Sequence, residues 1–92
     1  MNVNRMLKDV MNIQKFDYFV INKVTLITKN GTKLIRSNRP KIVIEFNRLY
    51  IFNEDELRCL WFNINEIETL EIVYSENIFG EFFSKKELYK VG

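Results

Sequence analysis

The chain has 92 residues and a mass of 11.1 kDa, which is the size of one small domain. Hydrophobic residues make up 47% of it and charged residues 28%, and these fractions exclude a disordered or collagen-like chain. Residues 1–48 hold ten basic and three acidic residues, a net charge of +7, whereas residues 49–92 hold four and nine, a net charge of −5. This asymmetry favours a charged partner, or charge pairing of the two halves within the fold or in a dimer.

Histidine is absent and cysteine occurs once, at Cys59. Without an imidazole, catalytic triads and histidine-ligated metal sites are excluded. A single cysteine cannot close an intrachain disulfide, so we expect a reducing compartment and a thiol packed in the core. The acidic run 54–56 lacks the spacing and the glycine of a calcium loop, and we interpret it as a solvated turn. We therefore predict that the protein is not an enzyme and binds no cofactor or metal.

Apolar runs are no longer than four residues, which argues against a signal-peptide core and a membrane span. We therefore predict a cytoplasmic protein that does not contact membranes. Isoleucine, lysine and asparagine supply 31 of the 92 positions and alanine is absent, a bias typical of AT-rich genomes. Short chains of this composition are frequent on phages and other mobile elements, and we take such an origin as a working hypothesis.

Apolar residues near the N-terminus follow the spacing of one helical stripe. They lie at i, i+3, i+4, i+7 and i+8, namely Val3, Met6, Leu7, Val10 and Met11. This spacing predicts an amphipathic helix over about 2–13. We expect its apolar face to cover one side of a small sheet; the alternative is a face that binds a partner.

After this helix, apolar residues alternate with polar ones and β-branched and aromatic types are frequent, which predicts strands. The Asn-Gly pair at 30–31 tolerates the positive φ angles of a type I′ turn. We therefore predict a hairpin of two strands, over about 23–29 and 32–37, joined by a two-residue loop. In this register Ile27 faces Leu34.

The chain then turns again at 37–40, because proline disfavours a helical residue before it and cannot donate to a strand ladder. A further turn at 47–48 sets Ile44 opposite Ile51.

A strand over 57–62 follows, and its register is open. A two-residue loop before it sets Leu49 against Leu60, whereas a three-residue loop sets Leu49 against Trp61. Residues 63–68 are expected to form a short helical turn or a loop.

Residues 70–75 alternate as a last strand, so an antiparallel β-meander of six or seven strands extends over about 16–75. In the C-terminal segment 76–92, the run 84–87 matches a capping box and predicts a short helix. The expected fold is a single α+β domain over 1–92, with the meander as a barrel-like or curved sheet.

Two stretches resemble known small β modules. The run from Val24 to Leu34, with its Lys-Asn-Gly turn, resembles the opening hairpin of Sm-like barrels. The stretch from Leu49 to Val73 is similar to strands and a turn of pleckstrin-like modules. The glycine of the next Sm strand is replaced by Leu-Ile-Arg at 34–36, and the second Sm signature is absent, so we assign no family.

The first candidate contact surface is a basic hairpin within 23–41, a range that contains no acidic residue. Its cations suit a phosphate backbone or an acidic protein surface. Lysine on an exposed strand also prevents edge-to-edge aggregation, so a solvated face is the alternative interpretation. The predicted contact residues are Lys23, Lys29, Lys33, Arg36, Arg39 and Lys41.

The second candidate surface is apolar and aromatic. The strands over 49–52 and 57–62 are apolar on both faces, and each face must be covered, either within the fold or by a partner. Aromatic residues dominate the binding energy of protein interfaces. The predicted contact residues are Ile27, Leu34, Tyr50, Phe52 and Trp61.

The C-terminal half offers a third surface, in which carboxylates imitate phosphates. Its members are Glu66, Glu68, Glu71, Glu76 and Glu81. The sequence leaves open whether this acidic half or the basic hairpin is the contact surface.

Together these features predict a small, non-enzymatic binding module that associates stoichiometrically with a protein partner. One concrete form is an inhibitor, encoded by a phage or mobile element, of a host nucleic-acid-processing or defence complex. The first alternative is a nucleic-acid-binding module that uses the basic hairpin with stacking aromatic residues. The second is a small structural subunit that forms a homodimer through an unpaired edge strand.

Overall fold

The computed structural model describes residues 3–15, 19–53 and 59–91. In this part of the chain, helix α1 (Val3–Lys15) is followed by seven strands and by the 3-10 helix η1 (Ile64–Glu66), which precedes β6. The strands are β1 (Phe19–Thr28), β2 (Lys33–Ser37), β3 (Lys41–Glu45), β4 (Arg48–Phe52), β5 (Leu60–Asn63), β6 (Ile67–Ile78) and β7 (Glu81–Lys90).

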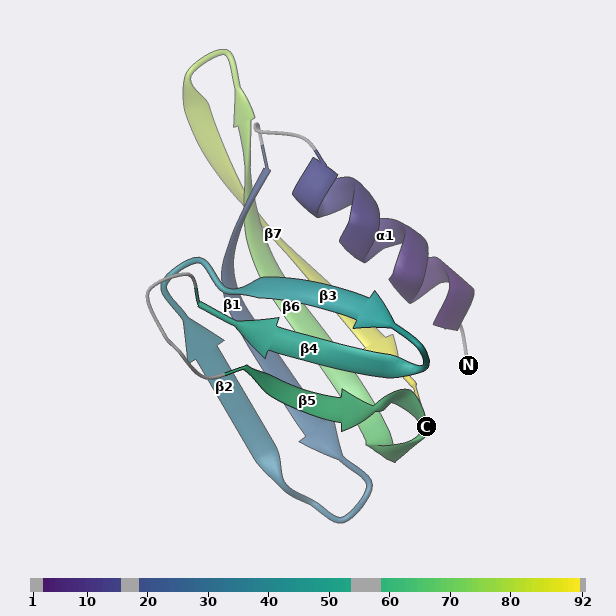
Figure 1. Cartoon of the computed structure of the whole chain (residues 1–92). Helices are drawn as coiled ribbons and strands as arrows, with labels where there is room; N and C mark the ends of the chain where they lie inside the picture. The colour runs from purple at the N-terminus through teal and green to yellow at the C-terminus, as the bar shows by residue number, and fades with distance from the viewer. Residues whose placement is uncertain (1–2, 16–18, 54–58, 92) are drawn as a thin grey trace.

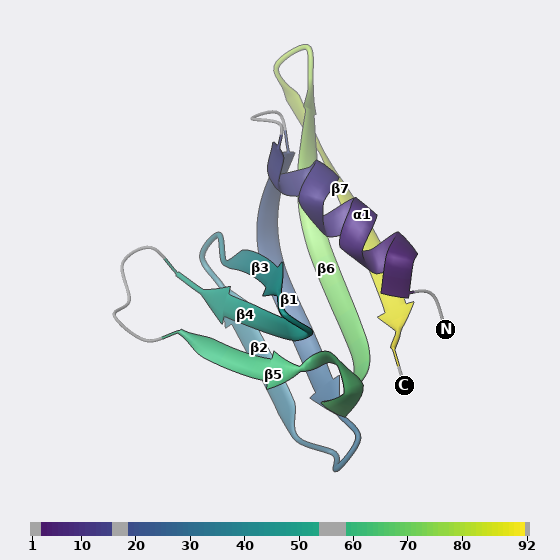
Figure 2. The ribbon, with the colours of Figure 1, turned by 45° about the vertical axis from the view of Figure 1, so that its right-hand side comes forward.

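The strands form two antiparallel sheets (Figure 1). Sheet A has the strand order β2-β1-β6-β7, and sheet B has the order β3-β4-β5. The strands of sheet B cross those of sheet A, and α1 lies beside sheet B on the same face of sheet A (Figures 1 and 2). Neither of them covers the opposite face, which we call the outer face of sheet A.

The predicted α+β fold with an N-terminal helix is confirmed, but the sheet is not a simple meander. β1 pairs with β2 on one side and with β6 on the other. The chain between these partners folds into sheet B, so within the described residues two open sheets replace the expected barrel-like or single curved sheet.

The expected C-terminal helix is wrong, because this segment forms strand β7. It pairs with β6 over ten residue pairs, from Thr69 opposite Lys90 to Ile78 opposite Glu81. The capping box at 84–87 offers only local hydrogen bonds, and the ladder of backbone bonds and cross-strand contacts outweighs them.

The β1–β2 hairpin forms where the Asn-Gly pair predicts it, but its register differs by one residue. Leu26 lies opposite Leu34, and Ile27 lies opposite Lys33, so the predicted pairing of Ile27 with Leu34 is wrong. A shift of one residue moves side chains to the other face of a sheet. Leu34 therefore faces the core, whereas Ile27 lies on the outer face.

The cause of the shift is a three-residue loop. Gly31 has a φ of +89°, and the Gly31 amide donates to the carbonyl of Thr28 at 3.0 Å. This geometry is a turn followed by a left-handed glycine, which Asn-Gly suits as well as it suits a two-residue turn. The Thr28 hydroxyl oxygen also accepts a hydrogen bond from the Thr32 amide at 3.0 Å, which fixes the longer loop.

The β3–β4 hairpin closes through Phe46 and Asn47, whose φ angles are +50° and +61°. This turn lies one residue earlier than predicted, so Ile44 faces Leu49 and not Ile51. The pairing partner of Ile44 changes by two residues, an even number, so the same side chains of β4 face the core as in the predicted register.

The two registers considered for β5 are both wrong, because Leu49 lies opposite Phe62. The preceding acidic turn at 54–56 lies outside the described residues. In the observed register Leu60 and Phe62 share the core face of Leu49, and Trp61 lies on the opposite face beside Tyr50.

The hydrophobic core fills the space between sheet A and the layer formed by α1 and sheet B. Every element of the two layers except the edge strands β2 and β5 contributes a buried apolar side chain. The central members are Met6, Val10, Val24, Leu26, Ile42, Leu49, Ile51, Ile67, Leu70, Ile72 and Tyr89. Met6 and Val10 of the predicted helical stripe lie in this core, whereas Met11 of the same stripe is 71% exposed and Ile13 is buried instead.

The side chain of Gln14 connects α1 to the edge of sheet B. Its amide nitrogen donates to the carbonyl of Ile42 at 2.6 Å, and its amide oxygen accepts from the amide of Ile42 at 2.8 Å. β3 is an edge strand, and edge strands present unpaired backbone groups. One glutamine therefore satisfies two backbone groups in the way that a neighbouring strand would.

We predict that Gln14→Ala lowers the free energy of unfolding by about 1–3 kcal/mol, because it removes both hydrogen bonds from a partly buried edge. Urea unfolding followed by circular dichroism measures this change. The control is Lys8→Ala, at an exposed position of the same helix, which should change the free energy by less than about 0.5 kcal/mol. Equal effects of the two substitutions would contradict the role of Gln14.

Candidate interaction surfaces

The basic residues predicted as one contact surface do not lie together. Lys23 and Lys33 are on the outer face of sheet A. Arg36 lies opposite the buried Val24, so it belongs to the other face, where it is half-buried.

The other three cations lie at the two ends of this hairpin. Lys29 is in the β1–β2 loop, whereas Arg39 and Lys41 flank Pro40 at the start of β3. A five-residue strand separates these positions by roughly 17 Å or more. The hairpin therefore presents its positive charge in several directions.

The apolar candidates divide in the same way. Ile27 is half-buried on the outer face of sheet A, and Leu34 packs against the core. The three aromatic candidates Tyr50, Phe52 and Trp61 lie together on the solvent side of sheet B.

The face of sheet B that points away from the core forms a continuous apolar surface. Val43, Tyr50 and Trp61 are direct neighbours across β3, β4 and β5. Phe52 follows on β4, and these four residues define the aromatic face. Val43 is 40% exposed and Trp61 48% exposed.

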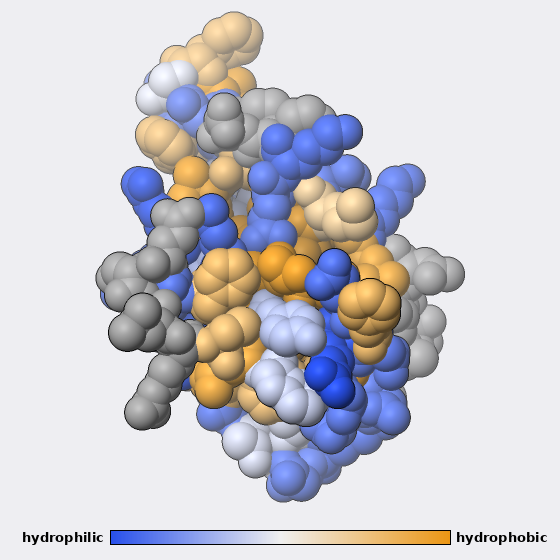
Figure 3. Space-filling view, viewed as in Figure 1, coloured by the Kyte–Doolittle hydropathy of each residue, from blue (hydrophilic) through white to orange (hydrophobic). Residues whose placement is uncertain are grey.

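An arginine completes the aromatic face. The guanidinium of Arg48 lies 4.3 Å from the centre of the Trp61 ring, a cation–π contact that holds both side chains. Figure 3 views this side of the molecule and shows a cluster of apolar and weakly polar residues over sheet B, with hydrophilic residues around it. The described part of the chain does not cover this cluster.

The outer face of sheet A has a different character. Its cations come from three strands, and Lys23 is half-buried whereas the others are exposed. We call this set the lysine face: Lys23, Lys33, Lys86 and Lys90. Two large apolar residues, Ile35 and Leu88, are exposed among them. Glu71 is on the same face and lies 3.6 Å from Lys86.

A hollow of about 510 Å³ opens between the end of α1, the start of β1 and one edge of sheet B. Its apolar walls include Ile13, Phe19 and Phe52, and Arg39 and Lys41 also line it. The hollow therefore combines apolar walls with positive charge.

The structure adds a surface that sequence reasoning did not identify as a contact site. The β6–β7 hairpin carries exposed phenylalanines at its tip, and Phe79 is the most exposed of them. The available signal was Gly80 between the apolar pairs at 78–79 and 82–83, which fits a hairpin turn. The capping box that follows Gly80 favoured the prediction of a helix in this segment instead.

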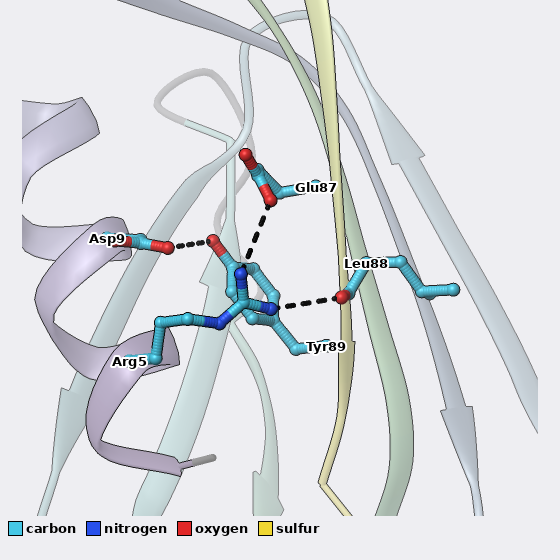
Figure 4. Close-up of polar contacts among 5 residues, drawn as sticks. All are labelled: Arg5, Asp9, Glu87, Leu88 and Tyr89. Atoms are coloured by element: carbon cyan, nitrogen blue, oxygen red, sulfur yellow. Dashed lines mark hydrogen bonds and ion pairs between the residues drawn. The ribbon is translucent and has the colours of Figure 1, made fainter. Parts of the chain in front are cut away.

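The densest polar cluster joins α1 to β7 (Figure 4). The hydroxyl of Tyr89 donates to the Asp9 carboxylate at 2.9 Å. Arg5 lies 3.7 Å from Glu87 and stacks 4.8 Å from the centre of the Tyr89 ring. It also donates to the carbonyl of Leu88 at 3.4 Å.

This cluster positions the helix. Burial raises the pKa of Tyr89 well above its ordinary value of 10.0, and the hydrogen bond to Asp9 raises it further. A phenol with a raised pKa stays protonated near neutral pH and is a weak nucleophile. The arrangement therefore holds α1 on sheet A.

The acidic residues of the C-terminal half do not form one strip. Glu71 pairs with Lys86, and Glu76 pairs with Lys85 at 2.6 Å. Glu66 accepts a hydrogen bond from Asn63 at 3.1 Å.

The described residues contain no group of three or more His, Cys, Asp or Glu side chains that could hold a metal ion. Cys59 is exposed, so its predicted place in the core is wrong. It precedes β5, where Leu60 and Phe62 take the inward positions.

Comparison with known proteins identifies no relative of this chain. No family model, curated protein or solved structure matches the chain. In the part of the chain that the structure describes, no helix has the length and apolarity that a membrane crossing needs. The surfaces above are therefore the basis for any functional conclusion.

We predict that alkaline pH destabilises the fold in part through Tyr89. Its pKa is raised in the folded state, so its contribution is fully present below pH 10 and is lost as the pH rises above 10, where the unfolded chain loses the proton first. One such group changes the free energy of unfolding by at most about 1.4 kcal/mol per pH unit. Tyr89→Phe should flatten this decline, as measured by urea unfolding between about pH 8 and about pH 11. A decline of unchanged slope would contradict the assignment.

Proposed function

We propose that this protein is a non-enzymatic binding module that associates stoichiometrically with a protein partner through the aromatic face of sheet B. The observation that carries the proposal is the unbroken row of Val43, Tyr50 and Trp61 across three strands. An inhibitor made by a mobile element is one concrete form of this proposal, motivated by composition alone.

The energetics of interfaces support this surface. Tryptophan, tyrosine and arginine carry most of the binding energy of protein interfaces, and here Tyr50, Trp61 and Arg48 are neighbours. Arg48 holds the Trp61 ring in place, so little side-chain freedom is lost on binding. A surface of this kind needs no cofactor.

The charges next to the aromatic face favour a protein over a nucleic acid. Glu45 lies opposite Arg48 at the end of the β3–β4 hairpin, so the two signs are mixed there. Arg48 already occupies one side of the Trp61 ring, which leaves less of it for base stacking.

We predict that Trp61→Ala and Tyr50→Ala each weaken partner binding at least about 30-fold, because aromatic residues at the centre of an interface carry the largest share of its energy. The experiment is affinity capture on the immobilised full chain, followed by measurement of the complex mass and of the dissociation constant for the captured protein.

The control for this experiment is Met11→Ala, which removes an apolar side chain that is 71% exposed on α1. It should leave binding unchanged, and circular dichroism should show that all variants fold. If neither aromatic substitution weakens capture, the aromatic face is not the contact surface.

The lysine face supports a second candidate function, nucleic-acid binding. Four lysines on one sheet face oppose a single carboxylate, Glu71. This set shares only Lys23 and Lys33 with the residues predicted from the basic hairpin. Four phosphate contacts would weaken duplex binding about 150-fold between about 50 and about 200 mM salt.

We predict for this second function that Lys33→Ala and Lys90→Ala each lower the salt dependence of the binding constant by the amount that corresponds to about one phosphate contact. Fluorescence anisotropy with labelled DNA and RNA measures it, and Lys8→Ala on α1 is the control. Absence of binding at the lower salt concentration would exclude this function and leave the aromatic face unaffected.

A further inference from the structure

We propose that the chain forms a homodimer by exchange of the β6–β7 hairpin tips, in which Phe79 of each copy enters the hollow between α1, β1 and β3 of the other copy. This proposal does not use Tyr50 or Trp61, although the hollow shares Val43 and Phe52 with the aromatic face. It rests on the shape and exposure of the tip, the strain at Phe79 and the opposite charges of tip and hollow.

The tip of the β6–β7 hairpin projects from the rest of the molecule (Figures 1 and 2). The described part of β1 pairs with β6 as far as Phe19 opposite Glu76, whereas β6 and β7 continue to Ile78 opposite Glu81. We call residues 77–83 the arm. Three residues beyond Glu76 place the end of the arm about 10 Å further along the strand.

The arm exposes more apolar surface than a solvated turn requires. Phe79 is 103% exposed and Phe82 is 65% exposed. Phe83 and Ile78 are also exposed. An exposed cluster of large apolar side chains on a projecting element is typical of a contact site.

Phe79 is also in an unfavourable backbone conformation. Its φ is +51°, and it precedes Gly80, whose φ is +84°. Positive φ is uncommon for a bulky residue, and asparagine or glycine is preferred in this type of turn. A strained, fully exposed aromatic residue adds nothing to the stability of a monomer. Phe46 has the same conformation, and the arm differs from that turn because it carries further exposed phenylalanines, Phe82 and Phe83.

The hollow has the properties that such a side chain needs. Its volume of about 510 Å³ exceeds that of one phenyl ring and lies in the range of about 300–1,000 Å³ that is usual for binding pockets. Ile13, Phe19, Ile42 and Phe52 supply apolar walls, and Arg39 supplies a cation.

The negative charge of the arm favours contact with a second copy of the chain over contact with a lipid surface. Glu81 lies two residues after Phe79, and the nearest cation on β7, Lys85, is paired with Glu76 at 2.6 Å. The arm therefore carries a negative charge that would face Arg39 of the other copy. Anionic lipid attracts basic segments, and a carboxylate beside the inserting residue opposes such contact.

The positions of arm and hollow permit reciprocal exchange. Phe19 lines the hollow and pairs with Glu76, at the base of the arm, so the two features are adjacent in each copy. A two-fold axis next to them would place each arm in the hollow of the other copy, as in a closed dimer.

The arms themselves offer a large apolar surface to such a dimer. At about 200 Å² for each phenylalanine, the exposed parts of Phe79, Phe82 and Phe83 amount to roughly 400 Å² per arm.

The test is sedimentation equilibrium of the full chain between about 1 and about 100 µM, with Phe79→Asn as the central variant. The wild-type chain should form a dimer, and Phe79→Asn should raise the dissociation constant of the dimer at least about 30-fold. Asparagine accepts positive φ, so at a concentration where the wild-type chain is monomeric this variant should have the higher thermal midpoint, which excludes misfolding as the cause.

The matched control is Phe46→Asn, at the same position of the β3–β4 turn, where phenylalanine is 90% exposed with a φ of +50°. It should also raise the thermal midpoint and should leave the dimer unchanged. Charge reversal tests the contact directly. Arg39→Asp and Glu81→Lys should each weaken the dimer, and the double variant should restore it.

A monomer at all concentrations would overturn the proposal. So would a dimer that Phe79→Asn leaves intact, a dimer that Phe46→Asn disrupts equally, or a charge-reversed pair that fails to restore association. A monomer that binds vesicles through Phe79 would assign the arm to lipid instead.

Discussion

The long antiparallel pair of β1 and β6 is the constraint on which the rest of the structure depends. It joins Phe19–Thr28 to Ile67–Ile78, with all of sheet B and β2 between them in sequence. One face of this pair carries Val24, Leu26, Leu70 and Ile72, and these side chains must be removed from water. α1 and sheet B together supply the cover, and their buried side chains form one core with those of this face. Because the pair is so distant in sequence, the loop between its strands must close before any of this burial is gained.

The described part of this short chain covers only one face of its longest sheet, and this incomplete cover determines which surfaces are exposed. The outer face of sheet A receives charged residues among half-buried apolar ones, whereas the outer face of sheet B keeps aromatic residues in neighbouring positions. The arm is a third consequence, since β6 and β7 extend beyond the described part of β1. Each surface thus follows from strand lengths and from the alternation of side chains along them.

The sequence predicted element types well and registers poorly. The helical stripe, the Asn-Gly turn and the short helical turn before β6 all lie where their local signals indicate. The Asn-Gly pair, however, fits two loop lengths, and the choice depends on the Thr28 side chain and on a bond from the Lys29 amide to the Glu66 carbonyl. Because a register shift of one residue moves side chains to the opposite face, the sequence could not show how the basic residues divide between the two faces of sheet A. Tyr50, Phe52 and Trp61 were found together because their strands are apolar on both sides in any register.

The hydrogen bonds between Gln14 and Ile42 give α1 a second role beside covering the core. α1 shields the core with Met6 and Val10, and the same helix occupies the open edge of β3 with Gln14. Lifting the helix would therefore expose an unpaired strand and an apolar surface at the same moment. Such a strand is a template for a further strand, supplied by another chain or by another copy. Attachment of the N-terminal helix thus protects this edge of sheet B from strand addition.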